Sequence, residues 1–374
     1  MPIKSVIIRS NQVCPDSRVE KEAAALIEYG HGITILSWDR RADYKTRQEQ
    51  IDVFGFDVPI IRFGHKAEFG AGFKNLKSYL LFQKDLFRWL IRNKEKYDVI
   101  HACDFDTAFT STIANLFLRK KIVFDIFDYI GGERRTLFQK IICRLQNWII
   151  NQSSATIICT EERRKQIKKS HPHNLVIIHN SPPQISELNA AKHKEGITKV
   201  CYVGILQDYR LLKEMPEFFI NHPNFELHIG GFGKYEEFYK KLSYTYKNII
   251  YYGSLQYQDT LKLENECDIM LAIYDPTIEN HIFAAPNKFY EGLMLGKPLI
   301  MVKGTGMSYI VEQYHIGETI EYSAKGFELG VLELSSRREE WPEISKKMKE
   351  IYNDFSWNEM KTRLDALYKK ICYE

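Results

Sequence analysis

Short apolar runs rich in β-branched residues alternate with longer amphipathic segments along the whole chain. Continuous apolar runs of this length are typical of strands buried on both faces, and a parallel sheet reaches that state only with helices on either side. The alternation therefore predicts an α/β protein. Expected strands cover, in order, residues 3–9, 33–38, 98–102, 121–125, 155–159 and 175–179, and then 199–204, 225–230, 248–253, 267–273, 298–302 and 316–320.

The segments between these strands have the periodicity of amphipathic helices. Residues 17–30 place apolar side chains three and four residues apart on one face, and Gly30 offers a C-terminal stop. Further helices are expected over 73–96, 134–150 and 342–373. Each half of the chain then becomes an open, Rossmann-like parallel sheet, whose ligands bind at the carboxyl ends of the strands. Two such domains predict a central cleft that suits a two-substrate group transfer.

The length of 374 residues predicts two domains at roughly 150 residues each. We expect an N-terminal domain over 1–182, a proline- and charge-containing linker over 183–198 and a C-terminal domain over 199–354. The last segment, 355–374, is expected to be a closing helix. It either crosses back onto the N-terminal domain or caps the second domain, and the sequence leaves both arrangements open.

Charge and cysteine content exclude several classes of protein. With 52 Lys and Arg against 48 Asp and Glu, the formal charge is only +4, so no global basic field exists to hold nucleic acid. The seven cysteines are scattered, without zinc spacing, which favours reduced thiols and no metal site. No apolar stretch approaches the ~20 residues of a spanning helix, and the first residues lack a secretory pattern. We therefore expect a cytoplasmic protein.

The densest group of chemically functional residue types is AAPNKFYEGLMLGKP at 284–298. Pro286 suits the start of a helix, whose first N–H groups and positive dipole end would form a diphosphate site. Lys288 adds a positive charge in the first turn, and Glu291 follows on the same face, where it would accept hydrogen bonds from ribose hydroxyls. A solvated ion pair on an ordinary helix remains the alternative.

The segment PNKFYEGLMLGKPLI resembles the donor-site motif of glycosyltransferase family 4 (the group 1 transferases), which are retaining enzymes with the GT-B fold. The resemblance covers nearly the whole chain and implies transfer of a sugar from a nucleotide diphosphate to a hydroxyl of a glycan or lipid-linked saccharide, as in surface polysaccharide assembly. Stretches that agree in order are CPDSRVEKEAAALIEYGHGITILSWDR, DVIHACDFDT, IVFDIFDY, YVGILQDYR, LHIGGFG, YYGSLQY and FSWNEMKTRLDALYKKI.

The resemblance also implies roles for individual residues. Protein cations would neutralise the departing diphosphate, because no Asp-x-Asp metal motif stands where the donor binds; we expect no metal and no cofactor besides a UDP- or GDP-type sugar donor. The implied catalytic residues are Arg210, Lys288 and Glu291, and the implied donor-binding residues are Gly204, Ala285, Pro286, Asn287, Gly231 and Gly233.

Three departures from the family pattern concern the sugar more than the diphosphate. The first of the family's two motif glutamates, expected eight positions before Glu291, is replaced by Phe283, and either Glu279 or Asn280 substitutes or the hydroxyl contact differs. The glycine pair after the first strand is missing. The histidine that often follows the IVFD-type strand is replaced by Phe127.

On the acceptor side, the resemblance and the strand ends point to Arg18, Asp104 and Asp128. Aspartates at such positions also serve as helix caps, an alternative that applies most directly to Asp16 and Asp106. His101 lies within an expected strand and is interpreted as a core residue.

Two amphipathic basic segments, 73–94 and 134–150, are candidates for contact with a membrane surface, with a solvent-facing basic helix as the alternative. The protein would then be peripheral on the inner face of the membrane. A non-catalytic nucleotide- or glycan-binding scaffold of the same fold is the alternative function. For the enzyme, we expect Lys288→Ala and Glu291→Ala to abolish transfer and leave the fold intact.

Overall fold

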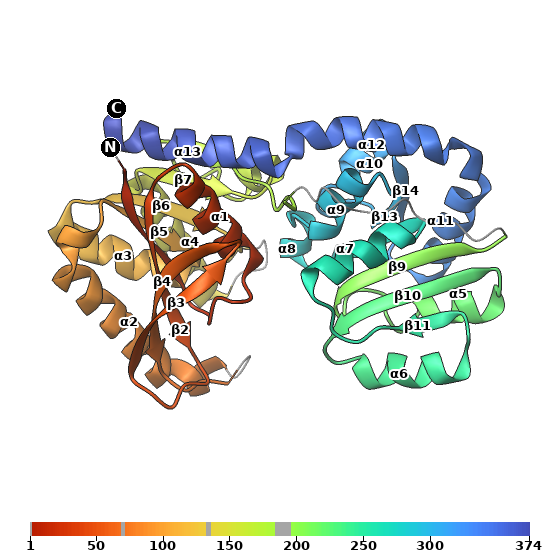
Figure 1. The fold of residues 1–374 in the computed structure, drawn as a ribbon, viewed down its shortest axis with the longest axis horizontal. Helices are drawn as coiled ribbons and strands as arrows, with labels where there is room; N and C mark the ends of the chain where they lie inside the picture. Colours follow the sequence, from red (N-terminus) through yellow and green to blue (C-terminus); the bar gives the residue numbers. More distant parts are fainter. Residues whose placement is uncertain (1, 69–71, 132–135, 184–195) are drawn as a thin grey trace. The chain divides into compact units, whose positions relative to one another are not determined.

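The computed structural model of the chain divides into two compact α/β units, which confirms the expected fold class. The first unit comprises Met1–His179 with Met360–Glu374, and the second comprises Asn180–Glu359. Each unit carries its own parallel-dominated sheet flanked by helices (Figure 1). Most of the expected linker lies outside the described residues, which are 2–68, 72–131, 136–183 and 196–374.

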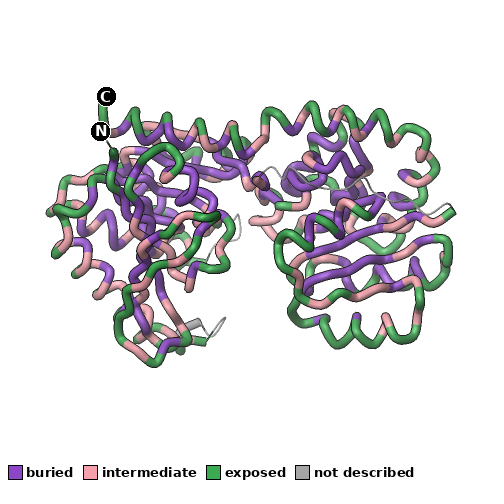
Figure 2. Tube along the Cα trace, in the orientation of Figure 1, coloured by how far each residue is buried: buried purple, intermediate pink, exposed green. Residues whose placement is uncertain are grey.

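The first unit contains an eight-stranded sheet in the order β3-β4-β2-β1-β5-β6-β7-β8. All pairs are parallel except β3 with β4. The central strands are buried along their whole length, as the purple trace of Figure 2 shows. The strands are β1 (Lys4–Arg9), β2 (Gly32–Asp39), β3 (Thr46–Val53), β4 (Phe56–Gly64), β5 (Val99–Cys103), β6 (Lys121–Ile126), β7 (Ala155–Ile158) and β8 (Leu175–Ile177).

The hairpin of β3 and β4 was not expected from the sequence. Its two-residue turn, Phe54 and Gly55, has positive φ at both positions (51° and 85°), as a tight hairpin with right-handed twist requires. Pro59 lies inside β4, and a proline within an apolar run argues against a sheet-interior strand. The other six strands of this sheet coincide with expected ones to within a few residues.

Helices cover both faces of the first sheet. Along β5, Ile100 faces a core with Phe82 and Leu86 of α2, whereas the neighbouring His101 faces the opposite side, where its Nδ1 lies 2.8 Å from the hydroxyl of Tyr368 in α13. Asp16 caps the first of these helices by accepting from the N–H of Val19, as the alternative interpretation of that residue stated. The helices are α1 (Ser17–Glu28), α2 (Leu76–Arg92), α3 (Asp104–Leu118), α4 (Leu137–Gln152) and α13 (Trp357–Tyr373), with single turns η1 (Gly72–Asn75), η2 (Lys94–Lys96) and η3 (Glu161–Lys165).

The C-terminal segment is two helices rather than one, because the backbone breaks at Ser356 (ψ 148°) between α12 and α13. From Met360 onward, α13 belongs to the first unit. Asp365 lies 3.1 Å from Nε2 of His31, and Lys361 lies 2.8 Å from a carboxylate oxygen of Glu28. These polar contacts, together with the Tyr368–His101 pair, attach the end of the chain to α1 and the sheet of the first unit.

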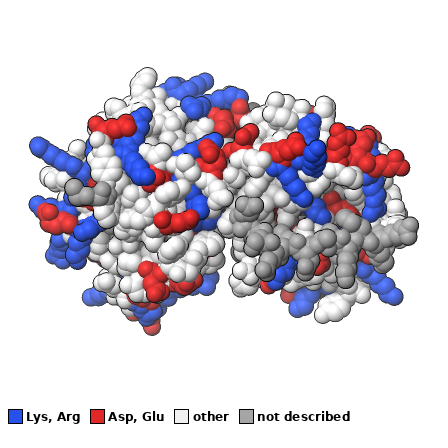
Figure 3. Space-filling model, turned by 45° about the horizontal axis from the view of Figure 1, so that its top comes forward, with Lys and Arg blue, Asp and Glu red and all other residues white. Residues whose placement is uncertain are grey.

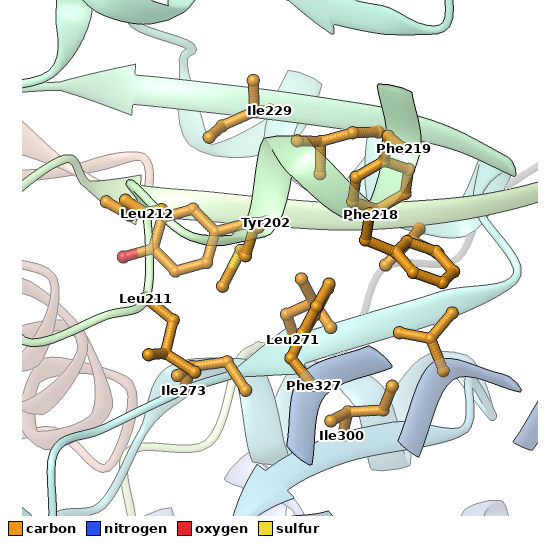
Figure 4. Close-up of a cluster of buried hydrophobic side chains, with 14 of the residues drawn as sticks. Tyr202, Leu211, Leu212, Phe218, Phe219, Ile229, Leu271, Ile273, Ile300 and Phe327 are labelled. Carbon is orange, nitrogen blue, oxygen red and sulfur yellow. The ribbon is translucent and has the colours of Figure 1, made fainter. Parts of the chain in front are cut away.

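The second unit contains six parallel strands in the order β11-β10-β9-β12-β13-β14, all at expected positions. Figure 4 shows its core, in which Tyr202 of β9, Leu271 of the fourth strand and Phe327 of a covering helix lie together. Chain order reverses between β9 and β12, so the carboxyl ends of these two strands form the switch point at which open sheets bind ligands. The strands are β9 (Thr198–Ile205), β10 (Phe225–Phe232), β11 (Ile249–Tyr251), β12 (Ile269–Ala272), β13 (Leu299–Val302) and β14 (Gly317–Ile320).

The helices of the second unit connect these strands. Their bounds are α5 (Met215–Asn221), α6 (Glu236–Thr245), α7 (Tyr257–Glu266), α8 (Glu279–Ile282), α9 (Asn287–Leu295), α10 (Ser308–Tyr314), α11 (Ala324–Ser336) and α12 (Trp341–Phe355), with one turn of 3-10 helix, η4 (Arg338–Glu340).

The face drawn in Figure 3 carries both signs of charge, in line with the small net charge. None of the helices in the described ranges is long and apolar enough to span a bilayer. All seven cysteines are free thiols, and five of them are buried.

Candidate functional site at the carboxyl edge of the second sheet

The donor-side glycines predicted from the sequence lie where β9 and β10 end. Gly204 is the penultimate residue of β9, and Gly231 is paired with it on β10. Gly231 has φ of 135°, and a Cβ there would lie 1.8 Å from the carbonyl oxygen of Gly204. Gly233, with φ of 134°, approaches the carbonyl oxygen of Leu206 in the same way. Gly231 and Gly233 are therefore required by the close approach of two backbones, independently of any ligand, whereas a Cβ at Gly204 would be in ordinary contact with the Tyr202 side chain.

The amino end of α9 lies beside the switch point. Ala285 and Pro286 lead into the helix, with Pro286 (φ −66°) as the N-cap and Asn287 as the first helical residue. The side-chain amide of Asn180 donates to the carbonyl of Ala285 at 3.0 Å and holds this entry in place. The first N–H groups of a helix have no partner within it, and the helix dipole is positive at this end. The entry to α9 therefore offers donors to an anion.

Lys288 in the first turn of α9 is not a solvated side chain. Its Nζ lies 2.7 Å from a carboxylate oxygen of Glu291 and 2.5 Å from one of Glu264, which comes from α7. The side chains of Glu264 and Glu291 are 0% and 1% exposed, and that of Lys288 is 16% exposed. The pair predicted at i and i+3 is thus part of a buried triad of one cation and two carboxylates.

Burial and charge shift the protonation of this triad. Burial raises the pKa of Glu264 to about 8, the carboxylate of Glu291 adds to the rise, and Lys288 opposes it. Burial lowers the pKa of Lys288, but the two carboxylates outweigh burial and raise that pKa overall. Lys288 therefore stays charged near neutral pH, while Glu264 holds a proton in much of the population. One oxygen of Glu264, Oε2, is buried without a hydrogen-bond partner.

Arg210 follows β9 and lies near the same strand end. Its guanidinium carbon is 3.8 Å from the centre of the Tyr274 ring, and its Nη1 is 3.0 Å from Nε2 of His281. Burial raises the pKa of Tyr202 on β9, and both Arg210 and Lys288 act on that phenol in the opposite direction. The two predicted cations are therefore both close enough to Tyr202 to act on its phenol, at the same part of the sheet edge.

The segment in which the first motif glutamate is missing forms the short helix α8. Phe283 is its C-terminal cap, and Glu279 and Asn280 are in its first turn, both half-buried. The N–H of Gly306 donates to the carbonyl oxygens of His281 and Ile282 at 3.0 and 3.1 Å and fixes this helix to the turn after β13. Substitution of the absent glutamate by Glu279 or Asn280 stays a prediction.

In the first unit, Asp104 directly follows β5 in a left-handed conformation with φ of 67°. Such strained non-glycine residues cluster at functional sites. Its carboxylate accepts from the N–H groups of Phe127 and Asp128, each at 3.0 Å, and pairs with Arg9. Burial raises the pKa of Asp104 to about 6, against the opposing charge of Arg9.

The other two acceptor-side residues lie in different surroundings. Asp128 is 72% exposed at its side chain, with one carboxylate oxygen 3.7 Å from Nη2 of Arg163. Arg18 is buried: Nε and Nη2 donate to the two oxygens of Asp125 at 3.0 and 2.9 Å, and Glu22 lies 3.2 Å away. The guanidinium of Arg18 is thus committed to the interior of the first unit, whereas Asp104 and Asp128 lie at the strand ends.

His101, Cys103 and Asp125 form the one group of possible metal ligands among the described residues. Arg18 occupies both oxygens of Asp125, and burial raises the pKa of the Cys103 thiol, which disfavours the thiolate that a metal needs. His101 itself is fully buried, in agreement with its interpretation as a core residue. The donor set therefore fits a buried ion-pair network and not a metal site.

The architecture of the two units is that of GT-B glycosyltransferases, as the comparison with solved structures shows. Sucrose-phosphate synthase from Thermosynechococcus elongatus matches with a TM-score of 0.72 at 12% identity over 99% of both chains. Anabaena Alr3699/HepE in complex with UDP-glucose matches with a TM-score of 0.69 at 13% identity, over 98% of this chain and 100% of that one. The lipopolysaccharide outer core galactosyltransferase WaaB matches with a TM-score of 0.63 at 11% identity, over 98% and 99%.

A family model matches part of the sequence. Residues 17–181 match the profile of Glycosyltransferase Family 4, which confirms the resemblance over most of the first unit. No curated protein matches the chain. The chain therefore has the GT-B fold, and the match of residues 17–181 to the Glycosyltransferase Family 4 model supports glycosyltransferase function.

Sequence reasoning missed two residues that complete the site. Glu264 is 24 residues before Lys288 and lies on another helix, so no local spacing reveals it. His281 contacts Arg210 across 71 residues. For Glu264 the sequence gives an indirect signal. Lys288 is a cation in the first turn of a helix, where the dipole disfavours it, and a nearby anion would offset that cost.

Proposed function

We propose that this protein is a retaining glycosyltransferase that moves a sugar from a nucleotide diphosphate to a hydroxyl of a glycan or lipid-linked saccharide. The single observation that carries the proposal is the convergence of Arg210 and Lys288 on Tyr202, beside the amino end of α9 and at the switch point of the second sheet. Two cations and a helix amino end are what a departing diphosphate requires.

In this proposal the bond between C1 of the sugar and the diphosphate oxygen breaks, and a bond from C1 to the acceptor oxygen forms on the same face. The acceptor proton passes to the departing phosphate oxygen, so the products are the glycoside and a nucleoside diphosphate. Arg210 binds the diphosphate through its planar fork of N–H donors, and Lys288 and the first N–H groups of α9 add to the stabilisation. Charge neutralisation by these groups makes the proposed reaction independent of a metal.

The triad of Lys288, Glu264 and Glu291 has two functions in this proposal. Glu291 accepts hydrogen bonds from the ribose hydroxyls of a UDP- or GDP-type donor. Because Glu264 is largely protonated near neutral pH, Lys288 is balanced by one full carboxylate rather than two. A phosphate that reaches the partly exposed side chain of Lys288 would therefore compete with only one carboxylate, that of Glu291, for the ammonium group. We assign contacts with the phosphates and the sugar to Asn287 and to the backbone around Ala285, which form the amino end of α9.

On the acceptor side, we place Asp104 and Asp128 in contact with the acceptor. The strained backbone of Asp104 and its position at the carboxyl end of β5 support this placement. Arg18 does not contact the acceptor in this proposal. It forms a buried ion pair with Asp125, near the carboxyl end of β6, and so fixes the strand end that precedes Asp128.

A lipid-linked acceptor would also give a purpose to the exposed apolar side chains of α2 and α4. Leu80, Phe138 and Ile141 are 57%, 63% and 47% exposed, and both helices carry lysine and arginine on their exposed sides. This combination supports peripheral binding to an anionic membrane surface. Residues 134 and 135 of the second basic segment lie outside the described residues.

The function is tested by incubating the purified protein with UDP-, GDP- and ADP-sugars and measuring release of the nucleoside diphosphate, with and without acceptor extracts. We expect release with one donor class, and we expect Arg210→Ala to lower kcat/KM by about 10²- to 10³-fold. Lys213→Ala, a change three residues away at an exposed lysine, is the control. Donor binding without turnover under any condition would instead indicate the non-catalytic scaffold.

Membrane contact is tested by co-sedimentation with vesicles of anionic phospholipid. We expect the wild type to bind and the double variant Leu80→Glu/Phe138→Glu to stay in solution. Tyr244→Glu, which changes a residue 83% exposed on α6, is the matched control. Failure of the wild type to sediment would remove the membrane from the proposal and leave the transferase reaction untouched.

A further inference from the structure

The loop that carries Arg210 has a strained backbone. The residues on either side, Tyr209 and Leu211, have φ of 69° and 55°, a left-handed conformation that non-glycine residues rarely adopt. Leu211 and Leu212 are nevertheless buried against Tyr202 in the core of the second unit (Figure 4). The surrounding packing therefore enforces this backbone, and its effect is to direct the intervening Arg210 side chain away from the core.

Three contacts define where the guanidinium of Arg210 lies. Its flat face lies over the ring of Tyr274 at 3.8 Å, Nη1 donates to the carbonyl of Tyr209 at 3.1 Å, and the same nitrogen is 3.0 Å from Nε2 of His281. The imidazole is also packed edge-on against Tyr274, with ring centres 5.0 Å apart at 85°. Tyr274 and His281 thus contact the guanidinium of Arg210 from two sides, one with its ring face and the other with a ring nitrogen.

The hydrogen bonds determine the state of His281. An arginine N–H only donates, so Nε2 of His281 accepts and carries no proton. Nδ1 lies 2.9 Å from the carbonyl oxygen of Asp275, which only accepts, so Nδ1 carries the proton. The ring is therefore neutral, in a single tautomer. A second proton would place an N–H opposite the N–H of Arg210 and a positive charge beside another.

The imidazole is itself held by the backbone. The N–H of Asp275 donates to the carbonyl of Tyr209 at 3.2 Å, so the loop of Arg210 and the loop after β12 are joined. The carbonyl of His281 accepts from Gly306 at 3.0 Å. The loop after β12 and the turn after β13 therefore fix the position of His281 as an acceptor. The guanidinium of Arg210 takes the orientation that lets it donate to this acceptor.

We infer that His281 is a positioning residue that holds Arg210 in the orientation from which it binds the donor diphosphate. The inference rests on the proposed function. The titratable groups around the imidazole are Arg210 and Tyr274 at contact, Asp275 through its carbonyl, and Glu279 on the same short helix. Tyr202 and Tyr322 lie beyond them, next to Arg210. Acidification that adds a proton to His281 breaks the contact with Arg210.

Two substitutions separate the hydrogen bond from the shape of the side chain. His281→Phe keeps the ring against Tyr274 and removes the acceptor, whereas the amide oxygen of His281→Gln reaches the position of Nε2. A hydrogen bond to a charged group is worth about tenfold to a hundredfold in an equilibrium or rate. We expect His281→Phe to lower kcat/KM for the donor by that factor, and His281→Gln to stay within about threefold of the wild type.

The pH profile provides a readout that a purely structural residue would not change. We expect the ratio of wild-type to His281→Gln activity to fall toward acid pH, because the imidazole can gain a proton and the amide cannot. Groups common to both proteins cancel in this ratio. Thermal unfolding of both variants checks that the fold is retained.

The outcomes distinguish the inference from the function on which it rests. If Arg210→Ala is inactive while His281→Phe has wild-type kcat/KM, the positioning role is refuted and the donor site stands. If His281→Gln is as impaired as His281→Phe, or the pH ratio is flat, the acceptor role of the imidazole is refuted. If Arg210→Ala turns over like the wild type, the proposed donor site itself fails.

Discussion

Replacement of Lys288 by methionine tests whether the triad in the second unit is as tightly coupled as its geometry indicates. Methionine has a similar length and no charge, so the change removes the one cation that lies 2.5 and 2.7 Å from two carboxylates that are 0% and 1% exposed. Removing one partner of a buried ion pair costs about 3–5 kcal/mol, because the remaining charge is neither hydrated nor paired. The variant is thus expected to lose stability as well as activity, unlike the expectation from the sequence.

The expected loss of unfolding free energy can be expressed as a shift in melting temperature, which depends on the size of the unit, Asn180–Glu359. A domain of this size loses about 2–4 °C per kcal/mol, so we expect its melting transition to fall by about 10 °C at pH 8. The loss should shrink as the pH falls toward about 4.5, where the carboxyl groups are protonated in the unfolded chain as well. Scanning calorimetry at several pH values measures both effects, and the transition of the first unit is an internal reference.

Two further variants serve as controls for the Lys288→Met melting experiment. Lys262→Met, on α7, changes a lysine that is 63% exposed and pairs with Asp259 at 3.1 Å, and it should cost less than about 0.5 kcal/mol. The double variant Lys288→Met/Glu291→Gln should recover part of the loss, because it removes the carboxylate that Lys288 balances, whereas Glu264 is already largely protonated near neutral pH. A Lys288→Met protein that melts like the wild type at pH 8 would refute the buried triad.

Three more outcomes follow from individual contacts. The pKa of Glu264 is raised to about 8, so the folded state keeps a proton that the unfolded chain releases near pH 4.5. The free energy of unfolding of the wild type should therefore fall as the pH rises from about 4.5 to 8, by at most ~1.4 kcal/mol per pH unit. Urea unfolding of Glu264→Gln at pH 5 and 8 should lack this pH dependence. Asp16→Ala should cost more in urea unfolding than the about 1 kcal/mol of a helix cap, because one carboxylate oxygen of Asp16 caps α1 and the other pairs with Arg9; Asp16→Asn loses the ion pair but keeps an acceptor for the cap, so losses as large as those of Asp16→Ala would argue against the cap. Gly231→Ala should destabilise the second unit far more than Gly253→Ala, which has φ of 69° but nothing within 4 Å of an added Cβ, whereas at Gly231 that atom meets the carbonyl of Gly204; thermal melts that rank the two alike would contradict the close approach.

Much of the fold was predictable because its strands are fully buried. A strand such as β5, with five consecutive buried residues, must be apolar along its length, and that composition is visible without a structure. The exception is the hairpin at the edge of the first sheet. β3 alternates between exposed and half-buried positions and β4 contains Pro59, so neither has the composition of a central strand. Its pairing depends on the turn at Phe54 and Gly55 and on contact with β2.

The candidate site was predictable only in its local part. Lys288 and Glu291 are three residues apart on one helix, and helical geometry places such a pair on one face. Arg18 shows the limit of this reasoning, because its position near a strand end pointed to the acceptor, whereas its partner Asp125 is 107 residues away in the sequence and buried. No spacing rule distinguishes a charged residue that faces a ligand from one that faces a distant counter-charge.

The sequence by itself determined the two α/β units, the positions of their main strands along the chain and the helix whose amino end carries Lys288, because burial periodicity and helix geometry act over a few residues. The tertiary structure decided the rest. It joined Glu264 to Lys288 and His281 to Arg210, and it enclosed Arg18 among carboxylates. Electrostatic contacts depend on distance in space and on burial, and both are set only when segments far apart in the chain come together.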